Sequence, residues 1–288
     1  MKSFALLVAG ACALLATACS RPAPIEARPA LWRVQDADTT IWLLGTIHVL
    51  PREVHWETPA IKAAIDGADM LVTEIPAQPP EQASAVFAAA ARAQGLSPIV
   101  DRLPSDRRAA LNDAARRAGL PIDALDGMKS WAAAAALGAG SSRALHATID
   151  HGVEAVLAQR FADTGKPRRA LETQAGQLAL FDTLSETAQR VLLVRAIEQS
   201  DGYAQTLAAW SAGDTARIVA SFQPGFRGAP DLEKTLVTDR NTRWSGWITR
   251  RMSAPGKVLV AVGAGHLAGD RSVVAMLRAR GLKVERIQ

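Results

Sequence analysis

The sequence predicts an α/β fold with a central sheet flanked by helices, and three observations support this. Apolar stretches typical of buried strands alternate with stretches of helical periodicity along most of the chain. Two of these strands, near opposite ends of the chain, each run into the pattern Gly-x-x-His. An Ala-rich stretch at residues 77–152 has helical character with Gly and Pro breaks, and we interpret it as an inserted helical lobe.

The first half of the domain has clear start and stop signals. Turn residues at 37–39 separate two short runs with strand character, which predicts a hairpin. Thr58 followed by Pro59 is a typical helix start, and a buried apolar run follows that helix before several prolines. The predicted elements are strands at 31–36 and 40–45, a helix at 58–68 and a strand at 69–75.

The second half alternates helices and strands in the same way. Its last part is the clearest unit, because a buried strand, a tight loop, an amphipathic helix and a final strand follow one another. The predicted helices are 152–164, 174–211 with short breaks, 232–252 and 271–280, and the predicted strands are 168–172, 257–262 and 282–287.

The first residues have the pattern of a bacterial signal peptide. Lys2 precedes an apolar run at residues 4–16 that is too short to cross a membrane as a helix and ends in small residues. We therefore assign residues 1–18 to a signal peptide. Ala18-Cys19 resembles the processing site of bacterial lipoproteins, so we expect the mature chain to begin with a lipidated Cys19. Plain cleavage after Ala18 is the alternative.

The segment after Cys19 is interpreted as a tether. Residues 19–30 are rich in Pro and Ala and favour a disordered link between the lipid and a single domain at residues 31–288. An acyl group on Cys19 would hold the protein on a membrane of the cell envelope, with the domain facing the periplasm. The basic residues are scattered rather than clustered, so nucleic acid is not expected as a partner.

Cysteine usage limits the chemistry of the mature domain. Cys12 and Cys19 are the two cysteines of the chain, and Cys12 lies inside the predicted signal peptide. The domain itself therefore has no thiol for nucleophilic attack or metal binding. A metal site in it must use His, Asp or Glu.

The two Gly-x-x-His patterns predict one shared site. His48 follows Gly45 after a strand, and His266 follows Gly263 after another. Glycine lets the chain turn sharply at the end of a strand, and ligands of open α/β sheets bind at the carboxyl ends of the strands. Glu74 ends a third buried strand and would lie at the same edge. For each residue alone, a loop histidine or an Arg-paired carboxylate is the alternative.

These side chains have the chemistry of metal ligands. Two imidazoles and a carboxylate can bind a divalent cation and leave positions open for a water molecule, whose pKa the metal lowers. Such nitrogen and oxygen ligands suit zinc, manganese, iron or cobalt without selecting among them.

A second set of polar residues is less specific. Glu172 ends a short predicted strand and Gln177 follows on the next helix, so they are candidates to orient a histidine, with helix capping as the alternative. Arg240 shares a helical face with Trp244 and Trp247. That face can present a guanidinium to an oxyanion or a carboxylate, or it can simply be a packed aromatic surface.

Taken together, the motifs resemble the TraB/GumN family. The matching stretches follow in order along nearly the whole mature domain: residues 45–51, Glu74, residues 165–167 leading to 171–173, Gln177, Arg240-Asn241, and residues 262–267 with Gly269. The resemblance implies a relation to the metal-dependent Tiki membrane proteases, and more distantly to haem-binding ChaN-like lipoproteins and erythromycin esterases.

The family resemblance assigns roles to particular residues. It implies His48, Glu74 and His266 as metal ligands, with Glu172 and Arg240 as the next polar residues of a catalytic site. One position departs from the family pattern, because relatives tend to have Asp where this chain has Glu154. The longer side chain would shift any contact by about one methylene.

Three functional hypotheses follow. The first is a metal-dependent hydrolase, peptidase-like, that acts on a peptide or protein substrate from a lipid anchor. No His-Glu-x-x-His helix is present in the sequence, so it would not be a standard zinc peptidase. The second is a non-catalytic envelope lipoprotein that binds haem, metal or peptide through the same histidines. A scaffold with purely structural polar residues is a third.

Overall fold

The computed structural model describes residues 23–226 and 229–288, so the predicted signal peptide and Cys19 lie outside the described residues. Its strands are β1 (Ile25–Glu26), β2 (Leu31–Gln35), β3 (Thr39–Thr46), β4 (Val54–His55), β5 (Met70–Thr73), β6 (Arg168–Ala170), β7 (Gly256–Gly263) and β8 (Val284–Arg286). Its α-helices are α1 (Pro59–Gly67), α2 (Pro80–Ala91), α3 (Arg108–Ala118), α4 (Asp123–Asp126), α5 (Ser130–Arg143), α6 (Val153–Asp163), α7 (Gln174–Asp182), α8 (Glu186–Glu198), α9 (Gly202–Ser211), α10 (Thr215–Phe226), α11 (Pro230–Glu233), α12 (Asp239–Arg251) and α13 (Val273–Ala279).

Two kinds of short helix complete the fold. A π-helical turn, η4 (Lys234–Thr238), joins α11 to α12, and a 3-10 turn, η5 (Ala264–Leu267), follows β7. Three further 3-10 turns are η1 (Ile99–Arg102), η2 (Ser105–Arg107) and η3 (Ile149–His151). Within the described residues, no helix is both long and apolar enough to cross a membrane.

The central sheet has the strand order β6-β5-β7-β3-β2-β8. Strands β6, β5, β7 and β3 are parallel, and β2 pairs antiparallel with both β3 and β8. The mixed α/β fold predicted from the sequence is therefore confirmed. Because four neighbouring strands run in the same direction, their carboxyl ends lie along one edge of the sheet, where open α/β folds bind ligands.

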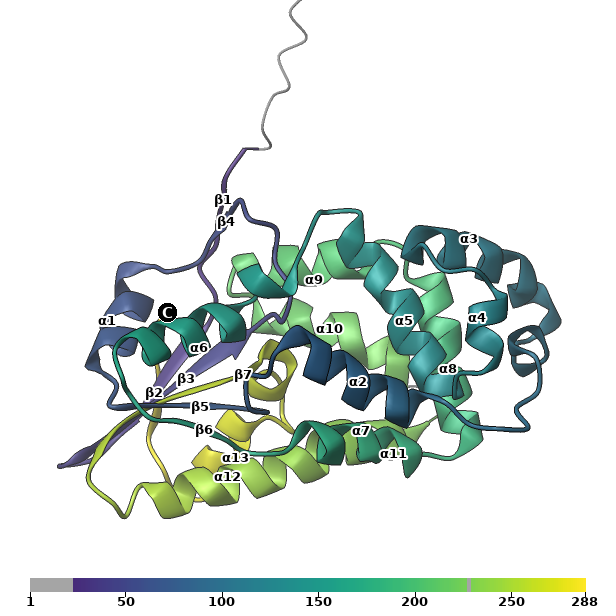
Figure 1. Ribbon diagram of the computed structural model, residues 1–288. Helices are drawn as coiled ribbons and strands as arrows, with labels where there is room; N and C mark the ends of the chain where they lie inside the picture. Colours follow the sequence, from purple (N-terminus) through teal and green to yellow (C-terminus); the bar gives the residue numbers. More distant parts are fainter. Residues whose placement is uncertain (1–22, 227–228) are drawn as a thin grey trace, which may run out of the picture.

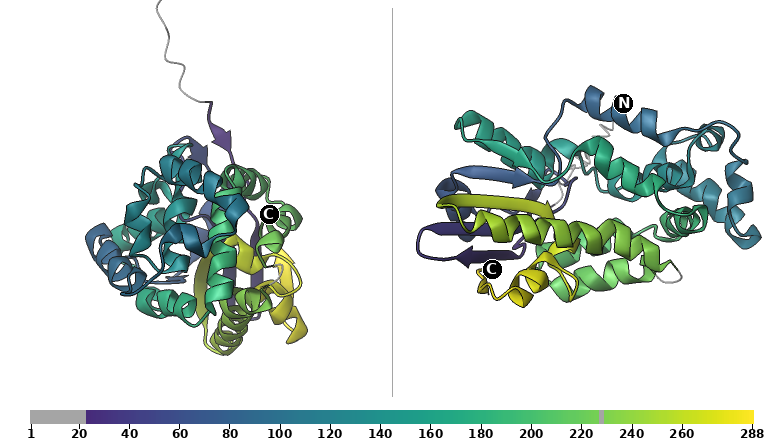
Figure 2. Two further views of the ribbon diagram at one scale, coloured as in Figure 1. Left: turned by 90° about the vertical axis from the view of Figure 1, so that its right-hand side faces the viewer. Right: turned by 90° about the horizontal axis from the view of Figure 1, so that it is seen from below.

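Both faces of the sheet are covered by helices, as Figures 1 and 2 show. Side chains alternate along β7, so that Leu259 and Ala261 pack toward α1 and α6, whereas Val258, Val260 and Val262 pack toward α12 and α13. Burial of apolar side chains on both faces contributes most of the stabilisation of such a sheet.

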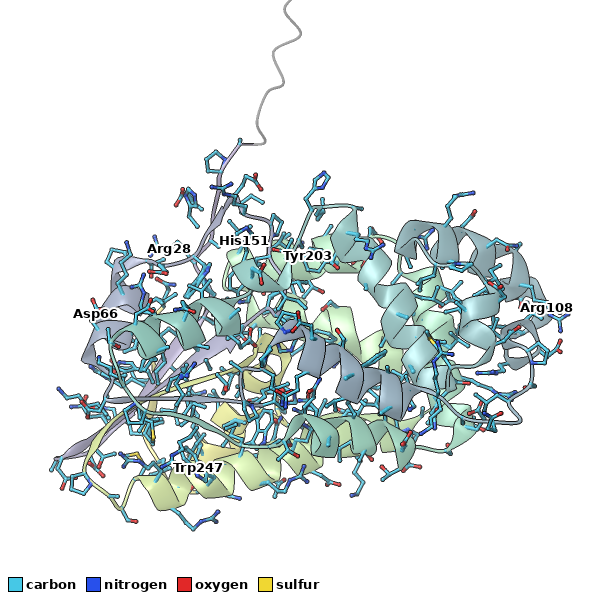
Figure 3. The ribbon with its side chains drawn as sticks, viewed as in Figure 1. Arg28, Asp66, Arg108, His151, Tyr203 and Trp247 are labelled. Atoms are coloured by element: carbon cyan, nitrogen blue, oxygen red, sulfur yellow. The ribbon has the colours of Figure 1, made fainter. Side chains whose placement is uncertain are left out.

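The remaining helices lie to the right of the sheet in Figure 1, and α9 and α10 also contribute side chains to the core under the sheet. Two hydrogen bonds hold α9 at the sheet edge near His48. The Trp210 indole donates a hydrogen bond to the carbonyl of Gly45 at 2.8 Å, and the Tyr203 hydroxyl, labelled in Figure 3, donates one to the carbonyl of Val49 at 2.8 Å. Helix α9 therefore holds both sides of the turn that carries His48.

Two features differ from the sequence-based expectations. The last part of the predicted tether is ordered, because Ile25 and Glu26 pair with β4, and Ala27 and Ala30 are buried. The predicted lobe at 77–152 is helical, but its apolar core includes side chains from α8, well outside that range. Helical periodicity reports which face of a helix is apolar and not which helix covers it, so this second difference is one of packing.

Candidate active site

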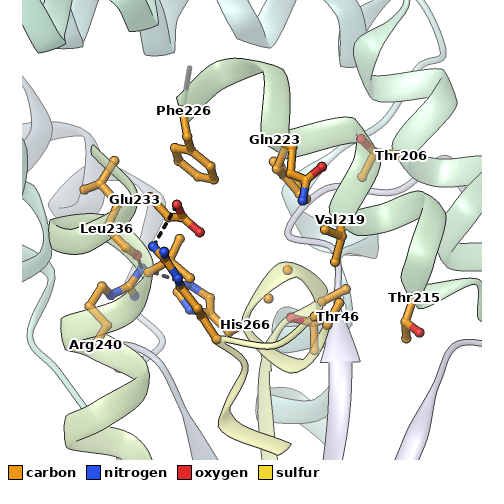
Figure 4. A pocket seen from close by; sticks show the side chains of 18 of the residues that line it. Thr46, Thr206, Thr215, Val219, Gln223, Phe226, Glu233, Leu236, Arg240 and His266 are labelled. Carbon is orange, nitrogen blue, oxygen red and sulfur yellow. Dashed lines mark hydrogen bonds and ion pairs between the residues drawn. The ribbon is translucent and has the colours of Figure 1, made fainter. Parts of the chain in front are cut away.

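The two Gly-x-x-His units meet at one edge of the sheet. Strands β3 and β7 are parallel neighbours in which Thr46 lies opposite Gly263, so both histidine loops leave the sheet side by side. They open into a cleft of about 1120 Å³ between the sheet edge and α7, α10 and the η4 turn. Figure 4 shows Thr46 at the tip of its strand and His266 below the side chains of α10. His48, Glu74, Gln177 and Arg240 also line the cleft.

Three glycines make this close approach feasible. A Cβ atom on Gly45 would lie 3.2 Å from the backbone of Ala264, and one on Gly263 would lie 3.1 Å from a carboxylate oxygen of Glu74. A Cβ atom on Gly152 would lie 2.0 Å from the carbonyl oxygen of His48. Any larger residue at Gly152 would therefore force α6 away from the His48 loop.

His48 is held by Glu154, where the family resemblance had implied an Asp. The Nδ1 atom of His48 lies 2.7 Å from Oε1 of Glu154, and the Thr46 hydroxyl donates a hydrogen bond to the same oxygen. The other carboxylate oxygen of Glu154 is buried and has no hydrogen-bond partner among the described residues. The longer Glu side chain thus reaches the histidine directly.

The His48 ring faces the cleft. Its side chain is 68% exposed, although the carbonyls on both sides of it accept hydrogen bonds, that of Ile47 from the Val153 amide and that of Val49 from the Tyr203 hydroxyl. The negative charge of Glu154 raises the pKa of His48 above its usual value and outweighs the effect of desolvation. Water in the cleft screens part of this attraction because so much of the ring is exposed.

Glu74 is buried at the floor of the cleft. Its Oε1 accepts a hydrogen bond from the Gly263 amide at 2.7 Å, and its Oε2 accepts from Gln177 at 2.8 Å and from Arg240 at 2.6 Å. Burial by itself would raise the pKa of Glu74, but nearby positive charge and the amide hydrogen bond hold it well below the usual range. The permanent positive charge among these partners is Arg240.

His266 has different surroundings from His48. It is 9% exposed, its Nδ1 lies 2.7 Å from Oδ1 of Asn241, and its Nε2 lies 3.0 Å from a guanidinium nitrogen of Arg240. Because a guanidinium only donates, Nε2 must be the unprotonated nitrogen, and Nδ1 then donates to Asn241. Burial lowers the pKa of His266 to about 4, and the charge of Arg240 acts in the same direction.

Arg240 is the centre of the buried cluster. All five of its N–H groups have protein acceptors: Nε bonds to the Glu172 carboxylate, one terminal nitrogen to His266 and to the Leu236 carbonyl, and the other to Glu74 and Glu172. The cation also lies 4.6 Å from the Trp244 ring centroid. The geometry therefore makes Arg240 a positioning residue that fixes two carboxylates and one imidazole.

The predicted metal ligands do not converge as a metal site in this arrangement. A divalent cation needs lone pairs from several side chains that point to one position. Here Nε2 of His266 and Oε2 of Glu74 both bond to Arg240, and Nδ1 of His48 bonds to Glu154. Among the residues that the structure describes, no group of three His, Cys, Asp or Glu side chains is arranged to hold a metal. Metal binding stays a prediction, and no chemical step is derived through it.

The structure brings most of the predicted site residues together, but their contacts differ from those predicted from the sequence. The cleft contains His48, Glu74, His266 and Arg240, and Glu172 lies directly behind Arg240. Their roles as ligands or catalytic groups stay predictions.

Three features of the site were not predicted from the sequence. They are the contact of Glu154 with His48, the use of Asn241 to orient His266, and the apolar face of α10. The spacing of Val219, Phe222 and Phe226 on one helical face was the available signal for that third feature.

Comparison with known proteins gives one match. A sequence model of the TraB/PrgY/gumN family matches residues 30–286. No curated protein and no solved structure matches the chain.

Proposed function

Because the chain belongs to the TraB/PrgY/gumN family, and because its cleft presents a carboxylate-bound histidine to solvent, we propose that it is a hydrolase of the bacterial cell envelope. Its substrate in this proposal is peptide-like, and His48 is the general base. The observation that carries the proposal is the His48 ring, held at Nδ1 by Glu154 and otherwise facing the cleft.

The chemistry follows from that contact. With Glu154 bound to Nδ1, the proton of the neutral ring is on Nδ1, and Nε2 has a free lone pair on the exposed side. Nε2 removes a proton from a water molecule as the water oxygen attacks a carbonyl carbon. The protonated ring then returns that proton to the leaving nitrogen as the carbon–nitrogen bond breaks. Glu154 stabilises the positive ring between these two steps.

The buried cluster has a positioning role in this proposal. Glu74 links β5 to the Gly263 amide at the end of β7, and Arg240 links Glu74 to Glu172 and His266. Groups held this firmly need little reorganisation during a reaction. The cluster thereby fixes the floor of the cleft that His48 also lines.

A cleavage assay tests the proposal. Purified protein is incubated with a diverse peptide library, once with a chelator and once with added zinc, manganese, iron or cobalt. The proposal expects cut peptides, and the comparison of the two conditions tests the predicted metal dependence separately. If peptides bind in the cleft but none is cut, the binding-lipoprotein hypothesis replaces the hydrolase.

The envelope location rests on the signal-like N-terminus and Cys19. In the native host, replacing Cys19→Ser should release the protein from membranes or leave an unprocessed precursor. Mass spectrometry of the wild-type N-terminus gives the direct readout. A soluble periplasmic wild-type protein without an acyl group would contradict the lipid anchor but not export.

A further inference from the structure

The cleft has an apolar wall that the proposed chemistry does not use. Six half-buried apolar side chains and one more exposed ring, Phe222 at 44%, face it. They come from three separate elements: Val219, Phe222 and Phe226 of α10, Leu180 and Phe181 of α7, and Leu236 and Val237 of the η4 turn. A concave surface lined mainly by apolar groups, with a few polar ones at one end, is typical of ligand sites.

The folded core uses only part of the apolar face of α10, because Val219 and Phe226 are half-buried against core residues whereas Phe222 is 44% exposed. Ile218, on the adjacent side of the helix, is 2% exposed and packs into the main core under the sheet. Val219, Phe222 and Phe226 follow at helical spacing on the side that faces the cleft, as Figure 4 shows for Val219 and Phe226. Apolar side chains gathered in one concave surface indicate a binding role.

This wall lies directly against the loop that carries His266. A Cβ atom on Gly265 would be 3.3 Å from the ring of Phe222, and one on Gly269 would be 3.0 Å from Val219. Gly269 also has a φ of +84°, which other residues rarely adopt. Because these two glycines have no side chains, the apolar wall approaches the cleft floor closely. A ligand group bound on the wall would therefore lie beside the polar residues of the floor.

The geometry points to a specificity subsite: the wall formed by α10, α7 and the η4 turn binds a bulky apolar side chain, of the Leu or Phe type, next to the bond that is cut. This inference rests on the proposed function for the peptide nature of the ligand and for the cut bond, whereas the apolar wall itself is a feature of the cleft. The cleft of about 1120 Å³ holds more than one such side chain, which leaves room for the neighbouring residues of a peptide.

Binding of non-cleavable peptides tests the subsite without turnover. The probes are five-residue peptides in which a reduced CH₂–NH group replaces one amide, with Gly, Ala, Leu or Phe immediately before it. Titration calorimetry measures their affinity for the full-length protein. Leu should bind about tenfold to sixtyfold more tightly than Ala, because Leu has three more carbon atoms and each contributes up to about fourfold when fully buried.

Two variants locate the effect. Phe222→Ala should remove most of the preference for Leu and Phe, and Phe222→Leu should restore much of it. The exposed ring makes a folding defect from this change small. Leu145→Ala is the matched control, because Leu145 is 38% exposed and does not line the cleft.

The outcomes separate the subsite from the hydrolase. Equal affinity across the series, absence of binding at millimolar peptide, or an unchanged preference in Phe222→Ala would each overturn the subsite. A clear preference for apolar residues with no cleavage of the matching amides would support the subsite and overturn the hydrolase. Cleavage without any side-chain preference would support the hydrolase and overturn the subsite.

Discussion

His48 and His266 come from the same short pattern at neighbouring strand ends, yet their surroundings are opposite. His48 is 68% exposed to the cleft and bonds to a carboxylate, whereas His266 is 9% exposed and lies between an amide oxygen and a guanidinium. Glu154 raises the pKa of the first ring, and burial lowers the pKa of the second to about 4. A shared motif therefore does not imply a shared role.

The difference arises outside the motif. The Gly-x-x-His turn places each ring at the sheet edge, but α6 brings Glu154 to His48, and α12 brings Arg240 and Asn241 to His266. In the account proposed here, the exposed histidine acts on the substrate, and the buried one belongs to the cluster that holds the cleft floor.

The largest expected effect comes from removing each ring in turn. His48→Gln should lower the rate of peptide cleavage by at least about a hundredfold, because the general base is lost, and the protein should stay folded at neutral pH. His266→Gln should reduce the free energy of unfolding by about 1–3 kcal/mol, because it disturbs a buried hydrogen-bonded pair. Cleavage rates and urea denaturation of both variants check this. Equal losses of activity and stability in the two variants would contradict the comparison.

Removal of the guanidinium tests whether the buried cluster is structural. Arg240→Met leaves the carboxylates of Glu74 and Glu172 without their main partner, so the free energy of unfolding should fall by about 3–5 kcal/mol. Arg240→Lys keeps the charge but not the forked contacts, and should cost less stability. Arg243→Met is the control: its side chain is 53% exposed and also contacts Glu172, so the loss should stay below about 1 kcal/mol. Denaturation curves measure all three.

The pH profile of cleavage tests the contact between Glu154 and His48. The neutral ring is the active form, so the rate should rise with pH through a pKa that Glu154 has raised. Glu154→Gln removes the charge, and the rising limb should move to lower pH while the maximal rate falls. Glu57→Gln is a matched control, because Glu57 has the same 20% exposure and pairs with Arg160 away from this cleft. If the rising limb of the pH–rate profile is unchanged in Glu154→Gln, His48 paired with Glu154 is not the general base.

The pH dependence of stability should differ in sign between the two rings. A neutral buried His266 takes up its proton only in the unfolded chain between pH 6.5 and about 4, so stability falls with decreasing pH by on the order of 3 kcal/mol. His48, whose pKa is raised, contributes stability below pH 6.5 that is lost as pH rises. Urea denaturation at pH 4.5 and 7 measures this. Compared with the wild type, the free energy of unfolding should fall less at pH 4.5 in His266→Gln and more in His48→Gln.

Local patterns were sufficient to predict the elements that carry the site. The hairpin of β2 and β3, the helix start at Thr58 and the strand that runs into Gly263 depend on neighbouring residues, and the structure has all of them. The convergence of His48 and His266 was predictable as well, because parallel strands end at one edge of a sheet.

The partners of these residues were not predictable in the same way. Nothing local to Glu154 indicates that α6 will bring it to His48, and the single sequence presented it only as a departure from a family pattern. The pairing of Arg240 with Glu74 depends on how α12 packs across the sheet. Side-chain contacts across long sequence separations are set by tertiary packing, on which periodicity within one helix carries no information.

The most direct test of the central claim is an NMR titration of the histidine rings in protein kept with a chelator. The chain has five histidines, and His48→Gln and His266→Gln assign the two that matter. The account predicts one ring that titrates above pH 6.5 and another that stays neutral down to about pH 4. Two rings that titrate together near pH 6.5, or a His266 that is protonated at neutral pH, would contradict it.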